Sequence, residues 1–297
     1  MTSPLPLLHA LLALLVITIW GSNFVVIKES LGQFPPILFA ALRFVFALLP
    51  AIFFVKRPPV PLWHLAAYGL LIGVGQFGLL YYAMDGHISP GLASVVMQSQ
   101  AFFTIFLTML IERERVKPIQ GVALLFAAAG IGIIALHTDT STTGLGLILA
   151  LIAATSWAGG NVVARQSGRV NMLAYVVWGS LFSAPPLLVL SAVFEGPARI
   201  AEAVTHADLY GWAGVLWQSY GNTLVGYVAW GWLLARHPAA TIAPTALLVP
   251  IVGLASAVWW LNEPLPFWKI AATALVVGGV ALNMLWPRII RPAGSST

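Results

Sequence analysis

Long apolar runs alternate with short polar segments along almost the whole chain. A helix rises 1.5 Å per residue, so crossing about 30 Å of hydrocarbon requires about 20 apolar residues. Charged residues, prolines and polar clusters divide the sequence into ten runs of about this length. We therefore predict ten transmembrane helices, over residues 7–27, 36–55, 63–84, 91–111, 118–136, 145–164, 172–194, 209–234, 239–261 and 269–286.

The first and the eighth runs differ from ordinary apolar helices. Residues 1–6 carry no positive charge and the run 7–27 is long enough to span, so we expect a retained helix instead of a cleaved signal peptide. The eighth run contains the polar segment WQSYGN at residues 217–222. Polar side chains in hydrocarbon need partners, so we expect this segment to face other helices.

The distribution of basic residues predicts the orientation. With both termini cytoplasmic, the cytoplasmic connections hold ten Lys or Arg residues and the opposite connections hold three, as the positive-inside rule requires. The cytoplasmic residues are Lys56, Arg57, Arg113, Arg115, Lys117, Arg165, Arg169, Arg236, Arg288 and Arg291, and the others are Lys28, Arg199 and Lys269.

The two halves of the chain repeat each other. Residues 20–26 (WGSNFVV) resemble residues 157–163 (WAGGNVV), and the spacing from Glu114 to Gly130 recurs from Glu263 to Gly279. We predict two five-helix repeats, 7–136 and 145–286, and an odd number of helices per repeat inserts the second copy upside down. Inverted repeats are typical of secondary transporters, which bind their substrate where the repeats meet.

Composition supports a membrane protein. Hydrophobic residues make up 60% of the chain and charged residues 8%, against about 25% charged in ordinary soluble domains. The formal net charge of +5 follows the predicted topology and gives no indication of nucleic-acid binding. The chain has no cysteine, which excludes disulfides, thiolate metal sites and thiol catalysis.

Several segments resemble the EamA-type drug/metabolite transporters over nearly the whole chain. They are residues 20–28 (WGSNFVVIK), 42–44 (LRF), 91–94 (GLAS) and 263–265 (EPL). Within that superfamily, residues 50–55, 98–104 and 248–256 are similar to the O-acetylserine/cysteine exporters of bacterial inner membranes, and the aromatic amino-acid exporters are less similar relatives. The resemblance implies a cavity between helices 1–4 and 6–9, peripheral helices 5 and 10, and alternating access.

Arg43 is the one ionisable residue that falls clearly inside a predicted span, about 10 Å from the end of its helix. A charge at this depth has to face protein or water. Arg43 could bind a substrate carboxylate or a gating partner. Alternatively, it could tie helices together through a salt bridge or backbone carbonyls, and the sequence favours this structural role slightly.

Two similar polar faces occur in the first helix of each repeat. Trp20 and Asn23 are three residues apart, and Trp157 and Asn161 are four apart, so each pair shares one helix face. An indole wall with an amide suits a neutral polar cavity. The alternative is close helix packing with interhelical hydrogen bonds.

Uncharged polar residues on three further helices are the remaining candidates for substrate binding. Amides in hydrocarbon need partners, so these sides of the helices cannot face lipid. The candidates are Gln76, Tyr81 and Tyr82 on the third helix, Gln98 on the fourth, and Trp217, Gln218, Tyr220 and Asn222 on the eighth.

No signature of an enzyme, a nucleotide site or a metal site occurs, and we expect no cofactor. The candidate residues favour an exporter of amino acids and related small metabolites with broad specificity, in contact with membrane lipids; the oligomeric state is left open. An extruder of lipophilic cations is the first alternative, although such a pocket usually contains a buried acid. A membrane enzyme or assembly subunit is the second. Because every Asp and Glu falls in a loop or at a span end, we predict transport without ion coupling.

Overall fold

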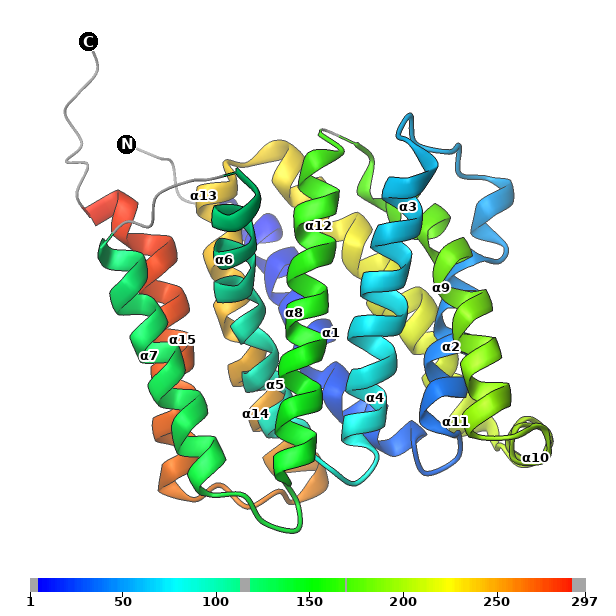
Figure 1. The fold of residues 1–297 in the computed structure, drawn as a ribbon. Coiled ribbons are helices and arrows are strands. Elements are labelled where there is room, and N and C mark those ends of the chain that lie inside the picture. The colour runs from blue at the N-terminus through cyan, green and yellow to red at the C-terminus, as the bar shows by residue number, and fades with distance from the viewer. Residues whose placement is uncertain (1–4, 113–117, 169, 290–297) are drawn as a thin grey trace.

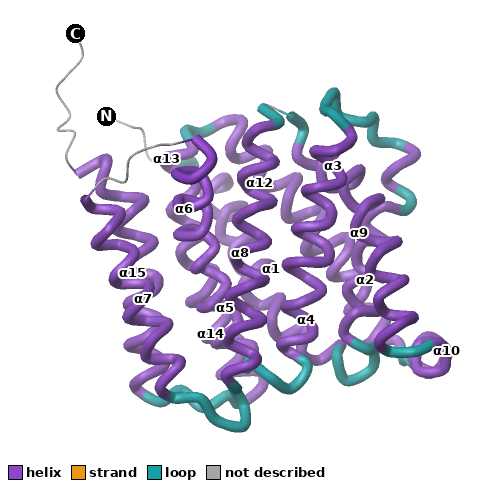
Figure 2. The backbone as a smooth tube through the Cα atoms, viewed as in Figure 1, coloured by secondary structure: helices purple, strands orange, loops and turns teal. Residues whose placement is uncertain are grey.

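The computed structural model describes residues 5–112, 118–168 and 170–289, and within these ranges all regular secondary structure is helical (Figures 1 and 2). This confirms the all-α prediction. The helices are α1 (Leu7–Ser30), α2 (Pro36–Leu48), η1 (Ala51–Phe53), α3 (Leu62–Gly69), η2 (Leu70–Gly78), α4 (Leu79–Met84), α5 (Pro90–Val96), η3 (Met97–Ser99), α6 (Gln100–Glu112), α7 (Pro118–Leu136), α8 (Gly144–Gln166), α9 (Met172–Phe194), α10 (Pro197–His206), α11 (Leu209–Leu216), η4 (Trp217–Val225), α12 (Gly226–Arg236), α13 (Ala239–Ile242), η5 (Ala243–Leu248), α14 (Val249–Leu261) and α15 (Phe267–Ile289).

Nine of the described helical stretches are long and apolar enough to cross a membrane. They correspond to nine of the ten predicted spans. The run 209–234 lies in an uninterrupted helix formed by α11, η4 and α12, but its polar middle segment keeps it outside the nine. The assignment of this helix as a tenth transmembrane helix therefore rests on its length and its place in the bundle.

The bundle has two distinct ends. The start of α1 and the end of α15 lie at one end, which we call the termini end, and the short helix α10 lies at the other, which we call the α10 end (Figure 1). Helices α7 and α15 pack together along one edge of the bundle. The remaining long helices surround the centre of the molecule.

The internal repeat is visible in the irregular helical turns. Both α3 and α11 have eight residues, and each continues into a π-helical segment of nine residues, η2 and η4. The next helix in each half contains a 3₁₀ segment, η3 in the first half and η5 in the second. Because π-helical segments are rare and common at functional sites, their recurrence directs attention to the space between η2 and η4.

Small residues bring neighbouring helices into close contact. Gly69 and Gly73 lie against Gly179 and Ser183 of α9, and the Ser183 hydroxyl donates a hydrogen bond of 2.8 Å to the Gly69 carbonyl. Close approach of this kind drives helix association in lipid, where apolar side chains gain little by packing on one another.

We expect Gly73→Ala to lower the thermal unfolding midpoint of the purified protein in detergent. A Cβ at this position would collide with the Cβ of Ser183, and overpacking of this kind costs about 1–3 kcal/mol. Gly132→Ala is the matched control, since a Cβ there meets no atom within 4 Å and alanine favours helix. Equal midpoints for the two variants would contradict the close packing of α9 against η2.

Candidate substrate-binding cavity

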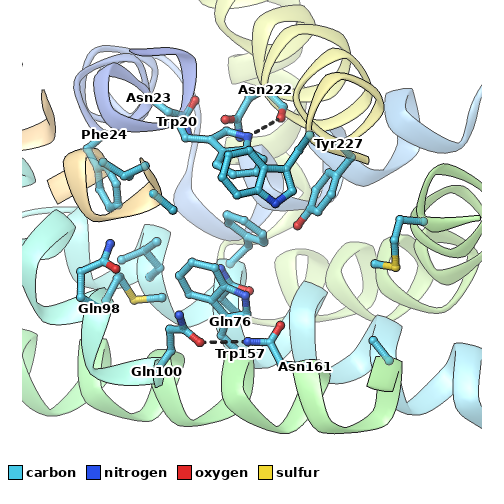
Figure 3. A pocket seen from close by; sticks show the side chains of 18 of the residues that line it. Trp20, Asn23, Phe24, Gln76, Gln98, Gln100, Trp157, Asn161, Asn222 and Tyr227 are labelled. Atoms are coloured by element: carbon cyan, nitrogen blue, oxygen red, sulfur yellow. Dashed lines mark hydrogen bonds between the residues drawn. The ribbon is translucent and has the colours of Figure 1, made fainter. Parts of the chain in front are cut away.

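A central cavity of about 460 Å³ lies between the two halves of the chain (Figure 3). This volume is within the range of small-molecule sites, about 300–1,000 Å³. The lining residues from the first half are Trp20, Asn23, Phe24, Ile27, Arg43, Tyr68, Gln76, Phe77, Leu80, Met97, Gln98 and Gln100, and those from the second half are Trp157, Asn161, Ala164, Met172, Asn222, Tyr227, Trp230, Gly231, Leu234, Ala246 and Val249.

The cavity opens towards the termini end. Its lining extends to Leu234 near the end of α12 and to Met172 at the start of α9, and Leu234 is exposed. At the opposite limit of the lining, Ile27 and Leu80 are fully buried. A solute could therefore enter from the termini end and would be stopped before the α10 end.

Arg43 is the centre of a buried hydrogen-bond network beside the cavity. Its Nη1 donates to the Tyr81 hydroxyl at 3.0 Å and to Gln218 Oε1 at 2.9 Å. The Tyr81 hydroxyl also donates to Gln218 Oε1 at 2.9 Å, and Gln218 Nε2 donates to Asn23 Oδ1 at 2.8 Å. The network thus connects α1, α2, α4 and η4, and it joins the two halves of the chain.

The charge of Arg43 is balanced without an acid. Among the described residues no carboxylate pairs with it, and its guanidinium lies 3.7 Å from the centroid of the Phe77 ring. A cation over an aromatic face is attracted by the ring quadrupole, and more strongly when both are desolvated. Hydrogen bonds and the ring therefore hold the cation in place, while its Nε has no partner among the described residues.

The two Trp/Asn faces predicted from the sequence both line the cavity. Trp20 Nε1 donates to the Asn222 carbonyl at 3.2 Å, and Asn161 Nδ2 donates to Gln100 Oε1 at 2.9 Å (Figure 3). Each face is therefore fixed by a polar contact to another helix. Packing and cavity formation, the two alternatives for these residues, occur together.

The other candidates fall into three groups. Gln76, Gln98 and Asn222 line the cavity, while Tyr81 and Gln218 lie behind it in the Arg43 network. Three candidates lie outside the lining: Tyr82 is exposed beside His87, Trp217 is exposed, and the Tyr220 hydroxyl donates to the Leu49 carbonyl.

Aromatic residues complete the lining: the sequence also offers Tyr227 and Trp230 on the eighth helix, whereas Tyr68 and Phe77 were not among the candidates. Tyr227 and Trp230 stand against Trp20, with ring centroids 5.9 and 5.2 Å away, and form an aromatic wall. Their spacing with Leu234, three and four residues apart, places all three on one helix face and could have indicated this wall. Tyr68 and Phe77 carry no comparable signal, because isolated aromatic residues are ordinary in apolar helices.

At the α10 end, Glu263 forms a buried set of polar contacts between the two halves, which we call the Glu263 cluster. Its carboxylate accepts hydrogen bonds from the Ser89 hydroxyl at 2.5 Å and the Gly91 amide at 3.0 Å, and pairs with Lys269 Nζ at 2.8 Å. The acid thus stabilises the start of α5, where the helix dipole favours negative charge. Its predicted counterpart Glu114 lies outside the described residues.

Two further contacts close the same end. Glu195, at the end of α9, accepts the amide hydrogens of Ile37 and Leu38 at 2.7 and 2.9 Å, at the start of α2. Gln33 and Asp208 exchange two hydrogen bonds, of 2.7 and 2.9 Å. The hydrogen bonds from the Gly211 amide and then from Gln33 lower the pKa of the Asp208 carboxyl, so it stays ionised at neutral pH.

The described residues contain no group of three His, Cys, Asp or Glu side chains that could hold a metal ion. Among the described residues, no Asp or Glu lines the cavity, and Arg43 is the one charged side chain in its lining. The chemistry of the cavity is therefore that of a binding site for a neutral or zwitterionic solute with apolar parts.

An all-helical apolar bundle in two similar halves, with a central polar cavity closed at one end, defines a membrane transporter of the repeat type. The EamA-like transporter family matches residues 7–136 and 144–285, which cover nearly the whole sequence, so the chain belongs to that family.

Similar proteins agree with this assignment. A protein of Salmonella typhimurium, named probable amino-acid metabolite efflux pump, is 41% identical over 95% of this chain and 96% of its own length. Its namesake in Escherichia coli K12 is 39% identical over 94% and 97%. An uncharacterized inner membrane transporter of the same organism, YedA, is 27% identical over 95% and 91%.

One crystal structure superposes with a TM-score of 0.64 at 18% identity, covering 96% of this chain and 99% of the other, which concerns the fold alone. The nine apolar helices and the family together make the chain a multi-pass protein of the bacterial inner membrane.

Proposed function

We propose that this chain is a secondary transporter that exports amino acids and related small metabolites by alternating access. The observation that carries the proposal is the composition of the central cavity, whose described lining contains amides and aromatic rings, one buried arginine and no carboxylate. Such a lining suits a small solute that carries one negative and one positive group. The names of the relatives in Salmonella and Escherichia coli support the same substrate class.

In this proposal the two repeats are inverted and both termini are cytoplasmic. The described basic residues at the termini end support this orientation: Lys56, Arg57, Arg165 and Arg236 lie in or beside its connections. The helix 209–236, which is the eighth along the chain, then also crosses the membrane and brings the number of spans to ten. Its buried polar side chains face other helices. The cavity in this structure consequently opens to the cytoplasm, the side from which an exporter loads.

Broad specificity is part of the proposal. The walls combine Trp20, Trp157, Tyr227 and Trp230 with amides that can donate or accept. Large apolar and small polar amino-acid side chains can both be accommodated by such a surface. Saturable transport of one side-chain class alone, from a panel of amino acids, would contradict broad specificity.

Drug resistance in cells distinguishes this function from extrusion of lipophilic cations. Cells that overexpress the protein are expected to tolerate toxic amino-acid analogues better than cells with an empty vector, and to gain no tolerance to cationic dyes. The reason is that the described part of the cavity lining contains no acid that would attract a cation. Resistance to dyes without resistance to analogues would favour the cation extruder.

We expect transport to follow the gradient of the substrate itself. A proton- or sodium-coupled carrier commonly has an ionisable or multi-oxygen ion site inside the membrane, and no Asp or Glu of the ranges 5–112, 118–168 and 170–289 lines this cavity. Proteoliposomes with equal substrate on both sides should show no net accumulation when a proton or sodium gradient is imposed. Accumulation driven by either ion would overturn this part of the proposal.

A further inference from the structure

Three buried side-chain atoms around the cavity have no hydrogen-bond partner in the described structure. They are Arg43 Nε, Gln76 Oε1 and Asn222 Oδ1. All three residues line the cavity, and their side chains are only 2%, 4% and 5% exposed. Buried polar atoms are nearly always paired in folded proteins, so three unpaired atoms beside one cavity indicate a partner that the protein itself does not supply.

The unpaired side of Arg43 has the geometry that carboxylates prefer. Hydrogen bonds to Tyr81 and Gln218 occupy Nη1, and neither Nε nor Nη2 bonds to another described residue. Nε and Nη2 lie side by side on one edge of the planar guanidinium. Two parallel N–H groups of this kind bind a carboxylate in a bidentate manner.

Gln76 and Asn222 provide the opposite chemistry. Neither side-chain amide forms a hydrogen bond with another described residue, and the Asn222 backbone is fixed by Trp20. An amide can turn its oxygen or its nitrogen towards a ligand, because the two orientations have nearly the same shape. An ammonium group, which only donates, would take the oxygen of such an amide.

Each of the two π-helical segments carries one unpaired amide and one residue in contact with Arg43. Gln76 precedes Phe77 in η2, and the Phe77 ring lies under the Arg43 guanidinium. Asn222 follows Gln218 by four residues in η4, and Gln218 is bonded to Arg43. Figure 3 shows Gln76 beside Trp157 and Asn222 beside Trp20 on opposite sides of the cavity.

We propose that these residues recognise the two charged ends of an α-amino acid, an inference that rests on the proposed function. The free edge of Arg43 binds the carboxylate, and the amide oxygen of Gln76 accepts a hydrogen bond from the ammonium group, while Asn222 can bind polar groups on the opposite side of the cavity. The substrate side chain is left against the aromatic wall, which explains why it can vary. Specificity is then directed at the backbone of the amino acid.

Water provides the competing explanation for the unpaired Arg43 atom. A second cavity of about 10 Å³ is also lined by Arg43, and this is close to the smallest space that holds one water. In that case Arg43 would be purely structural, and its loss would reduce the transport of every solute alike. Selectivity, rather than rate, therefore separates the two explanations.

The test compares phenylalanine with phenylalaninamide, which lacks the carboxylate, and with N-acetylphenylalanine, which lacks the ammonium group. Transport into liposomes containing the purified full-length protein is measured for each. The wild-type protein is expected to prefer phenylalanine over either analogue by about tenfold or more, since each analogue loses a charge-assisted contact. Equal transport of the three compounds would overturn the inference while leaving the proposed function intact.

Two variants test which residues bind the carboxylate and which bind the ammonium group of the amino acid. Arg43→Gln should reduce the preference for phenylalanine over its amide. Gln76→Glu should shift preference towards the amide, because the new carboxylate attracts the ammonium group that both compounds carry and repels the carboxylate that only phenylalanine carries. Thr155→Val, at an exposed hydroxyl bonded within its own helix, is the control and should leave both ratios unchanged.

The possible outcomes distinguish failure of the inference about residue roles from failure of the proposed function. If Arg43→Gln lowers the transport of all three compounds by one factor, the structural explanation holds and the inference is wrong. If Arg43→Gln does not fold, the test rests on the ratio of phenylalanine transport to phenylalaninamide transport in Gln76→Glu. A ratio equal to that of the wild-type protein overturns the inference. If the wild-type protein transports neither phenylalanine nor any other amino acid above empty liposomes, the proposed function fails and the inference fails with it.

Discussion

Oxidation of a Ser30→Cys/Gly214→Cys variant is expected to stop transport almost completely, and a reducing agent is expected to restore it. Ser30 ends α1 in the first half, and Gly214 lies in α11 in the second half, both at the α10 end. A Cβ at Gly214 would lie 3.3 Å from the Cβ of Ser30, close to the range of about 3.5–4.5 Å found in disulfides. A bond at this point holds the two halves together where the cavity is closed.

The expected loss follows from the alternating access that we propose for this protein. A solute loaded from the termini end can leave only if the α10 end opens, which requires α1 and α11 to separate. The chain has no cysteine of its own, so the two single-cysteine variants are clean controls and should transport normally under oxidising conditions. Undiminished transport by protein shown to be fully cross-linked would contradict opening between α1 and α11.

Glu263→Ala is expected to cause the largest loss of stability among single substitutions at the α10 end. Glu263 and Lys269 are 9% and 2% exposed, and removing the acid leaves the lysine charge buried without a partner. Breaking a buried pair from one side costs about 3–5 kcal/mol. The change also removes the acceptor of the Ser89 hydroxyl and the Gly91 amide.

Thermal unfolding in detergent measures this loss, with two comparisons. Glu202→Ala removes an exposed acid from α10 and should leave the midpoint nearly unchanged. A double variant, Glu263→Gln/Lys269→Met, should be more stable than Glu263→Ala because no unpaired charge remains. If Glu263→Ala unfolds at the same temperature as Glu202→Ala, the buried contacts of the Glu263 cluster do not stabilise the fold.

The sequence predicted the parts of the fold that depend on local chemistry. Nine apolar stretches match predicted spans because hydrocarbon thickness imposes a length that composition reveals directly. The Trp20/Asn23 and Trp157/Asn161 faces line one cavity because spacings of three and four residues place side chains on one side of a helix. Both signals are local in the sequence and require no knowledge of neighbouring helices.

The remaining features depend on contacts between distant residues or on irregular turns. The bonds from Arg43 to Gln218 and from Gln218 to Asn23 join residues on three helices, and no spacing along the chain encodes them. The π-helical segments each add a residue to a turn, which rotates the following side chains by about 100° relative to a regular helix. Trp217 and Tyr220 became candidates through their polar groups alone, and they lie in η4 outside the cavity lining, because composition does not tell which side of a helix faces a cavity.

Exchange of amino acids by the purified protein tests the central claim most directly. Liposomes containing the protein are loaded with an unlabelled amino acid, and the uptake of the same amino acid in radiolabelled form is followed from outside. The account predicts uptake that saturates with concentration and is faster in loaded than in unloaded vesicles, because each return of the carrier brings a labelled molecule inward. Uptake equal to that of protein-free liposomes, for every amino acid in the panel, would contradict it.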